Sequence, residues 1–180
     1  KLFKLFAMLA LSLCTTLASA QALKPFILGS KGPGDLAEKV EITKKALTEA
    51  GFTVVGTYNP YANTSLIVVT NDELKNTAAK SEHGGFGAAQ RVSVVKIKDE
   101  VQVAYANPTY WANVYRMGGD LKGVVDKMQA ALGKVEEFGA KGLTPEQLRK
   151  YHYMMMMPYF DDPDKLVLHP SHEAAVKAVE

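Results

Sequence analysis

The chain has 180 residues, of which 47% are apolar and 22% charged, and its formal net charge is +2. This length and composition suit one globular core and exclude the collagen-like, disordered and disulfide-scaffold classes. The 21 Lys and Arg residues are nearly balanced by 19 Asp and Glu residues. A nucleic-acid-binding protein usually has a strong basic excess, so we expect no nucleic-acid partner.

Residues 1–20 have the composition of a secretory signal peptide. A basic start precedes an apolar run from Leu5 to Leu13, and Ala18-Ser19-Ala20 supplies the small residues of a cleavage site before Gln21. The run is shorter than the ~20 residues of a membrane span, and no later segment is longer. The sequence therefore predicts a periplasmic or secreted mature chain with no transmembrane segment. Cleavage also removes Cys14, the single cysteine.

A short strand followed by a capped helix opens the mature chain. Pro25–Gly29 is an apolar run that predicts a strand, and Gly29–Gly34 predicts a turn. Asp35 has the position of an N-cap, with Glu38 three residues later as in a capping box. Gly51 stands where a glycine commonly terminates a helix, so the first helix is expected to end there.

Four further strands follow from runs rich in β-branched residues. The expected strands are residues 52–57, 65–70, 91–98 and 101–106, with a turn at 58–63 and a short helix at 71–80. The last two strands flank Asp99-Glu100, and a two-residue connection between alternating apolar runs predicts a β-hairpin.

Three helices are predicted in the remainder. An apolar stripe starts after Asp120 and stops at Gly139, and a capped helix from Thr144 is expected to run through Met157. Ser171 is expected to start a last short helix. The predicted fold is α+β, with a mainly antiparallel sheet of four to five strands packed against two main helices. Its predicted regions are a signal peptide (1–20), the α+β domain (21–139) and a helical C-terminal extension packed on that domain (140–180).

Several segments resemble the domain of unknown function 302 family. They are ALTEAGF at 46–52, LIVVTN at 66–71 and RVSVVKIKDEVQVAYANP at 91–108, and the resemblance covers residues 26–138. It implies a compact α+β domain with a tendency to form homodimers. The family brings no established activity and no catalytic residues to this chain.

Two aromatic turns at strand ends are the first candidate site. Tyr58-Asn59-Pro60-Tyr61 resembles the segment from Tyr105 to Trp111, and both contain Asn-Pro. Tyr and Trp combine apolar bodies with polar tips, which suits binding of a small molecule or a protein partner. Alternatively, Asn-Pro only initiates turns while the aromatic rings complete the core. The candidate ligand-binding residues are Tyr58, Tyr61, Arg91, Tyr105, Tyr110, Trp111 and Tyr115.

The segment from Tyr151 to Met157 is the candidate metal site. On a helix, His152 lies three and four residues from Met155 and Met156 and shares a face with both. Imidazole with thioether suits copper, and His with Met also serves as an axial pair for haem iron. The chain contains no C-x-x-C-H motif for covalent haem. The alternative is that the methionines fill an irregular packing interface.

Three functions follow, in order of preference. The first is a secreted, non-enzymatic module that binds a small ligand or partner and forms a homodimer. The second is a copper- or haem-binding protein that uses His152 with Met155 or Met156. The third is an enzyme of unknown reaction, which would draw on His83, Arg91 and Tyr105, although the sequence contains no recognisable catalytic motif.

Overall fold

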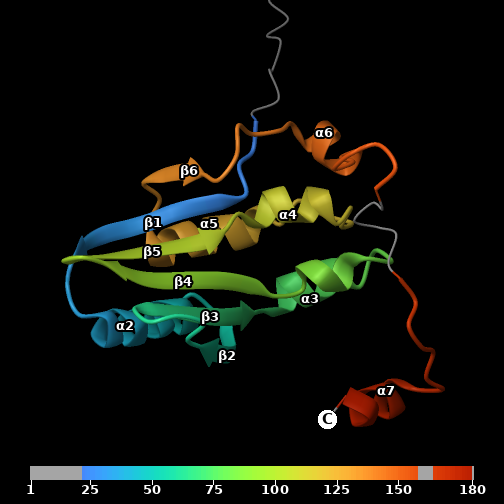
Figure 1. The fold of residues 1–180 in the computed structure, drawn as a ribbon, viewed down its shortest axis with the longest axis horizontal. Coiled ribbons are helices and arrows are strands. Elements are labelled where there is room, and N and C mark those ends of the chain that lie inside the picture. The colour runs from blue at the N-terminus through green and yellow to red at the C-terminus, as the bar shows by residue number, and fades with distance from the viewer. Residues whose placement is uncertain (1–21, 158–163, 180) are drawn as a thin grey trace, which may run out of the picture.

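A computed structural model describes residues 22–157 and 164–179, in which an antiparallel sheet has the strand order β2-β3-β4-β5-β1-β6 (Figure 1). The strands are β1 (Phe26–Pro33), β2 (Thr53–Tyr58), β3 (Thr64–Thr70), β4 (Gln90–Ile97), β5 (Glu100–Ala106) and β6 (Glu136–Phe138). The helices are α2 (Leu36–Glu49), α3 (Asp72–Ala78), α4 (Pro108–Val114), α5 (Lys122–Leu132), α6 (Pro145–Arg149), α7 (His172–Val179) and the short 3₁₀ helix η1 (Gly84–Gly87). The predicted antiparallel α+β fold is confirmed, and the predicted signal peptide lies outside the described residues.

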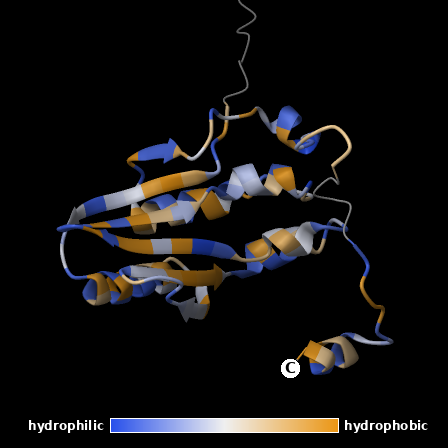
Figure 2. Ribbon diagram, in the orientation of Figure 1, coloured by the Kyte–Doolittle hydropathy of each residue, from blue (hydrophilic) through white to orange (hydrophobic). Residues whose placement is uncertain are grey.

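Side chains alternate between two unequal faces of the sheet. One face is buried against α2 and α5, which Figure 1 shows behind the strands. Its core consists of Ile27, Ile67, Val69, Val92, Val94, Val101, Val103 and Tyr105 with Val40, Leu47, Val124, Met128 and Leu132 from the helices. The intervening strand residues occupy the other face, which we call the open face, and Figure 2 shows the resulting alternation of hydropathy along the strands.

The predicted helix cap and helix end are present in the first half of the chain. The Asp35 carboxylate accepts a hydrogen bond from the Glu38 amide at 3.1 Å, and Gly51 follows α2 with a φ of +85°. The β4–β5 hairpin is also present. Its loop is Lys98-Asp99 rather than Asp99-Glu100, and Lys98 adopts a φ of +56°.

The predicted turn at Gly29–Gly34 is instead most of β1. The register with β5 shifts between Leu28 and Ser30, which leaves Gly29 in a bulge. A Cβ on Gly29 would lie 2.7 Å from the Leu132 carbonyl oxygen. The glycine therefore allows β1 to pack closely against the end of α5, a tertiary contact that local turn propensity does not reveal.

The second long helix is shorter than predicted, and an additional strand follows it. Gly133 takes a φ of +82° and ends α5, and the Val135 amide then donates to the Leu28 carbonyl oxygen at 2.7 Å. The chain continues as β6, which pairs Phe138 with Phe26 at the edge of the sheet. This strand makes six in the described chain where four to five were expected.

The predicted helix from Thr144 to Met157 ends early. The capping box of Thr144 and Gln147 is present, but α6 stops at Arg149. The Arg116 Nε donates to the Arg149 carbonyl oxygen at 2.9 Å. That oxygen is the acceptor that the amide of Tyr153 would need in a continuing helix.

The C-terminal extension contacts the domain unevenly. Leu148 of α6 is buried, and the Arg149 Nε donates to Asn113 Oδ1 of α4 at 2.8 Å. In contrast, α7 has no buried residue, and Figure 1 shows it apart from the sheet. Within the described part of the chain, every helix is too short or too polar to cross a membrane.

Tyr105 links the sheet to the end of α5 and gives a prediction about pH. Its hydroxyl donates to the Gly133 carbonyl oxygen at 2.9 Å, and burial, with the charge of Glu137, raises the pKa of Tyr105 above its ordinary 10.0. The folded chain therefore holds this proton more tightly than the unfolded chain. Stability should fall as pH rises above about 10, where the unfolded chain releases the proton first.

We expect Tyr105→Phe to lower the free energy of unfolding at neutral pH by about 0.5–1.5 kcal/mol, because the hydrogen bond is lost. The variant should also lose less stability than the wild type between neutral pH and about pH 11. Urea unfolding at several pH values measures both effects. Tyr58→Phe is the control, because Tyr58 is 52% exposed. Identical alkaline slopes for wild type and Tyr105→Phe would contradict the assignment.

Candidate ligand-binding site

A continuous row of aromatic rings crosses the end of the sheet where β1 begins and β5 ends. The ring centroids are 5.7 Å apart for Phe138 and Phe26, and 6.4 Å for Phe26 and Trp111. The row continues through Tyr115 at 5.7 Å and Phe86 at a further 5.7 Å, and His83 stacks on Phe86 at 6.4 Å. We call these six residues the aromatic row. Tyr110 lies beside it, edge-on to Trp111 at 5.3 Å.

Helix α4 positions the centre of the aromatic row. Residues 108–114 form this helix, with Pro108 in its first turn, whereas the segment from Tyr105 to Trp111 was predicted as a turn. The Trp111 Nε1 donates to the Pro25 carbonyl oxygen at 3.1 Å, and the Asn107 Nδ2 donates to that of Lys24 at 2.9 Å. These bonds fasten α4 to the start of β1 and fix the Trp111 ring.

Small side chains on the open face create a hollow beside the row. Ser93 pairs across the strands with Leu66 on one side and Ala104 on the other. These small residues lie between the larger Leu66 and the rings of Phe26 and Phe138. The hollow, which we call the sheet cavity, has a volume of about 350 Å³ and is lined by Phe26, Leu66, Arg91, Ser93, Ala104, Tyr105, Ala106 and Phe138.

A second hollow lies on the other side of Arg91, next to α4. This α4 cavity has a volume of about 270 Å³ and is lined by Val68, Phe86, Gly87, Ala89, Gln90, Arg91, Ala106, Trp111 and Tyr115. The two cavities share Arg91 and Ala106. Arg91 therefore stands between two mainly apolar hollows that the aromatic row borders.

Arg91 is the exposed cation of this site. Its side chain forms no hydrogen bond or ion pair with any residue that the structure describes. Burial raises the pKa of Tyr115, and the positive charge of Arg91 partly offsets that rise. The guanidinium thus lies close enough to act electrostatically on the aromatic row while its donors are available to a ligand.

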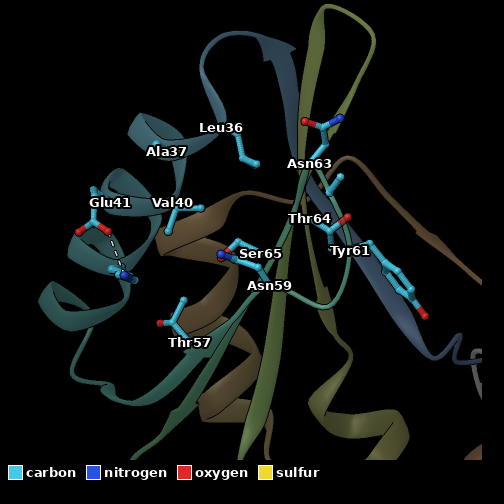
Figure 3. Close-up of a pocket in the computed structure, with 12 residues that line it drawn as sticks. Leu36, Ala37, Val40, Glu41, Thr57, Asn59, Tyr61, Asn63, Thr64 and Ser65 are labelled. Atoms are coloured by element: carbon cyan, nitrogen blue, oxygen red, sulfur yellow. Dashed lines mark hydrogen bonds and ion pairs between the residues drawn. The ribbon is translucent and has the colours of Figure 1, made fainter.

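Tyr58 and Tyr61 lie outside the aromatic row. Tyr58 is the last residue of β2 and pairs with Leu66, which lines the sheet cavity, whereas Tyr61 lies in the β2–β3 loop. Tyr61 borders a third hollow, which lies between α2 and this loop and which we call the hairpin cavity (Figure 3). Its volume is about 470 Å³. The structure therefore brings together Arg91, Tyr110, Trp111 and Tyr115. Tyr58 lies one strand beyond Leu66 of the sheet cavity, and Tyr61 lies at a different cavity.

Tyr105 borders the sheet cavity, but its ring belongs to the core. It is only 1% exposed, and its hydroxyl is bonded to Gly133. Strand alternation places the Tyr105 ring and the Arg91 side chain on opposite faces of the sheet. His83 is stacked on Phe86 at the far end of the aromatic row. The three residues considered for an enzyme thus do not converge on one point.

Sequence reasoning missed three rings of the site. Phe26 and Phe138 face each other across β1 and β6, and Phe86 lies in η1. The alternation of β1 places Phe26 on the face opposite Ile27, which was a usable signal. The sequence shows no strand alternation around Phe138, and its segment was predicted as the end of a helix.

The candidate metal ligands lie beyond α6 in a segment without helical structure. Met155 is 88% exposed, and Met156 is 98% exposed with a φ of +71°. The helical spacing that placed His152 with these methionines is therefore absent, and neither Met155 nor Met156 is packed against the described residues. Among the described residues there is no group of three or more His, Cys, Asp or Glu side chains arranged to hold a metal ion.

Comparison with known proteins identifies the fold. No protein-family model matches the chain, and no curated protein matches it. The solved structure of the uncharacterized conserved protein DUF302 from Bacillus stearothermophilus is similar, with a TM-score of 0.51 and 12% sequence identity. The match covers 57% of this chain and 92% of that protein. At this identity the likeness concerns the fold alone: this chain has the α+β architecture of a protein of the domain of unknown function 302.

Proposed function

We propose that this protein is a non-enzymatic binding module for a small organic carboxylate with an apolar or aromatic body. The observation that carries the proposal is Arg91, an exposed cation without an acidic partner among the described residues, shared by two apolar cavities. The ligand's carboxylate would face the guanidinium. Its apolar body would occupy the sheet cavity, against Phe26 and Phe138.

The chemistry of the site favours a carboxylate over a neutral ligand. A guanidinium presents parallel donors that match the two oxygens of a carboxylate. Hydrogen bonds to a charged group contribute about 1.5–3 kcal/mol, more than bonds between neutral groups. Apolar walls around a few polar groups are typical of small-molecule sites, and cavities of about 300–1,000 Å³ are the usual size.

We place this activity outside the cytoplasm, in a periplasm or the extracellular medium. The support is the signal-peptide pattern of residues 1–20, with its basic start, apolar run and Ala18-Ser19-Ala20. Without that segment the chain contains 19 basic and 19 acidic residues, a balance that does not favour a nucleic-acid partner.

Binding should depend on the ligand's charge and on Arg91. Trp111 is the only tryptophan in the chain and lines the α4 cavity, so its fluorescence reports on the site. Phenylbutyrate should change this fluorescence at lower concentrations than phenylbutanol, which lacks the carboxylate. Arg91→Gln should weaken phenylbutyrate binding by about 10-fold or more, because charge-assisted bonds are lost, and leave phenylbutanol binding nearly unchanged.

Lys31→Gln is the matched control for Arg91→Gln. Lys31 is an exposed cation on the open face, where it pairs with Gln102 far from the aromatic row. The Lys31→Gln variant should bind phenylbutyrate with the affinity of the wild type. Equal affinity for the acid and the alcohol, or equal losses in both variants, would refute the role of Arg91.

We also propose a homodimer, which the resemblance to the domain of unknown function 302 family implies. Exposed apolar side chains on the open face, among them Phe26, Tyr58 and Phe138, are compatible with such contact. Light scattering on the chain that starts at Gln21 should give the mass of two chains. A strictly monomeric protein at high concentration would remove the dimer from the proposal.

A soft-metal site is the alternative function. Met155 and Met156 are exposed thioethers next to His152, a combination that copper or haem iron accepts. We expect protein isolated from its native compartment to be colourless and free of stoichiometric copper, by absorption and elemental analysis. Copper or haem that is present in the wild type and lost in His152→Ala would favour the metal-binding alternative instead.

A further inference from the structure

The hairpin cavity is separate from the Arg91 site and lies at the other end of the sheet. One wall is α2, with Leu36, Ala37 and Val40, and the opposite wall is the end of β2, the β2–β3 loop and the start of β3. Figure 3 shows Leu36 and Val40 pointing from α2 toward the strands, with Ser65 and Asn59 facing them. Its volume of about 470 Å³ exceeds that of either cavity beside Arg91.

The strand wall carries polar side chains that have no hydrogen-bond partner among the described residues. Ser65 is only 4% exposed as a residue, and its hydroxyl forms no hydrogen bond with any described residue, but the hydroxyl oxygen stays accessible from the cavity. The side chains of Thr57, Asn59 and Asn63 surround the same cavity and are also unpaired among the described residues. Together they offer donors and acceptors to a ligand.

The cavity presents no uncompensated charge. Glu41 and Lys44 are its charged lining residues, and the Lys44 Nζ lies 2.9 Å from Glu41 Oε1. This ion pair, which Figure 3 marks with a dashed line, cancels the charge on the α2 wall. An anionic or cationic ligand would find no unpaired counter-ion here. The hairpin cavity thus differs in charge from the two cavities beside Arg91, which is an exposed cation.

The backbone around the cavity is held in place before any ligand arrives. The Thr64 amide donates to the Tyr61 carbonyl oxygen at 3.3 Å, and the Lys96 amide donates to that of Asn63 at 2.9 Å. Asn63 has a φ of +60°, a left-handed conformation that asparagine tolerates better than most residues. A preformed loop lowers the entropic cost of binding.

We propose that the hairpin cavity binds a small neutral polyol, such as a monosaccharide. Hydroxyl groups of the ligand would exchange hydrogen bonds with Ser65, Asn59 and Thr57, because each partner both donates and accepts. The C–H face of a sugar ring would contact Leu36 and Val40 on the α2 wall. The proposal depends on neither Arg91 nor the proposed carboxylate.

NMR titration of the isotope-labelled chain from Gln21 tests this site with four probes: glucose, xylitol, gluconate and cyclohexanol. Glucose or xylitol should shift resonances of residues 36–44 and 57–65, and leave those around Trp111 unchanged. Gluconate and cyclohexanol, which add a charge or lack most hydroxyls, should bind at least about 5-fold more weakly, the loss expected for about one net hydrogen bond.

Variants on one strand provide matched controls. Thr57→Ala should weaken glucose or xylitol binding, whereas Thr53→Ala should not, because Thr53 lies at the other end of β2 and outside the cavity. Ser65→Ala, with its thermal unfolding measured in parallel, should weaken binding by roughly 5-fold. The proposal is overturned if neither polyol shifts these resonances at tens of millimolar, if gluconate binds more tightly, or if Thr57→Ala and Thr53→Ala behave alike.

Discussion

In the part of the chain that the structure describes, helices α2 and α5 cover one face of the sheet and leave the other open, and the proposed Arg91 site depends on this asymmetry. Strand residues alternate, so Val92 and Val94 enter the core while Arg91 and Ser93 face away from it. A sheet buried on both faces would leave no place for an unpaired arginine, because burial of an uncompensated charge is costly. The open face accepts Arg91 at no such cost and leaves its guanidinium available to a ligand.

The close approach of β1 to the end of α5 connects the core to the proposed site. Gly29 and Gly133 lack side chains where the backbones meet, and a Cβ on Gly133 would lie 2.6 Å from the Gly29 carbonyl oxygen. Tyr105 bonds to the same turn from the core face. This turn sends the chain into β6 and sets Phe138 beside Phe26. Packing inside the core thereby builds one wall of the cavity outside it.

Local signals predicted the parts of the fold that are locally determined. The Asp35 cap, the Asn71 start of α3 and the β4–β5 hairpin rest on residues a few positions apart, and all are present. The early end of α6 and the formation of β6 depend instead on partners more than thirty residues away or across the sheet. Arg116 donates a hydrogen bond to the carbonyl oxygen of Arg149, and β6 pairs with β1 at the edge of the sheet. No short window of sequence contains those contacts.

The candidate site shows the same division. Residue type and position predicted that Arg91, Tyr110, Trp111 and Tyr115 belong to one site. The separation of Tyr61 from that site follows from strand direction in the sheet. The two similar Asn-Pro turns lie at opposite ends of an antiparallel sheet. Their composition does not show at which end each turn lies. Because of this topology, residues predicted to form one aromatic pocket border separate cavities of different chemistry.

The pKa of a bound carboxylate tests the role of Arg91 most directly. Phenylbutyrate labelled at its carboxyl carbon reports its own protonation by NMR when bound to the protein. A guanidinium beside the carboxylate favours the charged form, so the pKa of the bound acid should lie below that of the free acid and return toward it in Arg91→Gln. A bound pKa above the free value would show a carboxyl group buried among apolar side chains without a cation, and would contradict the account.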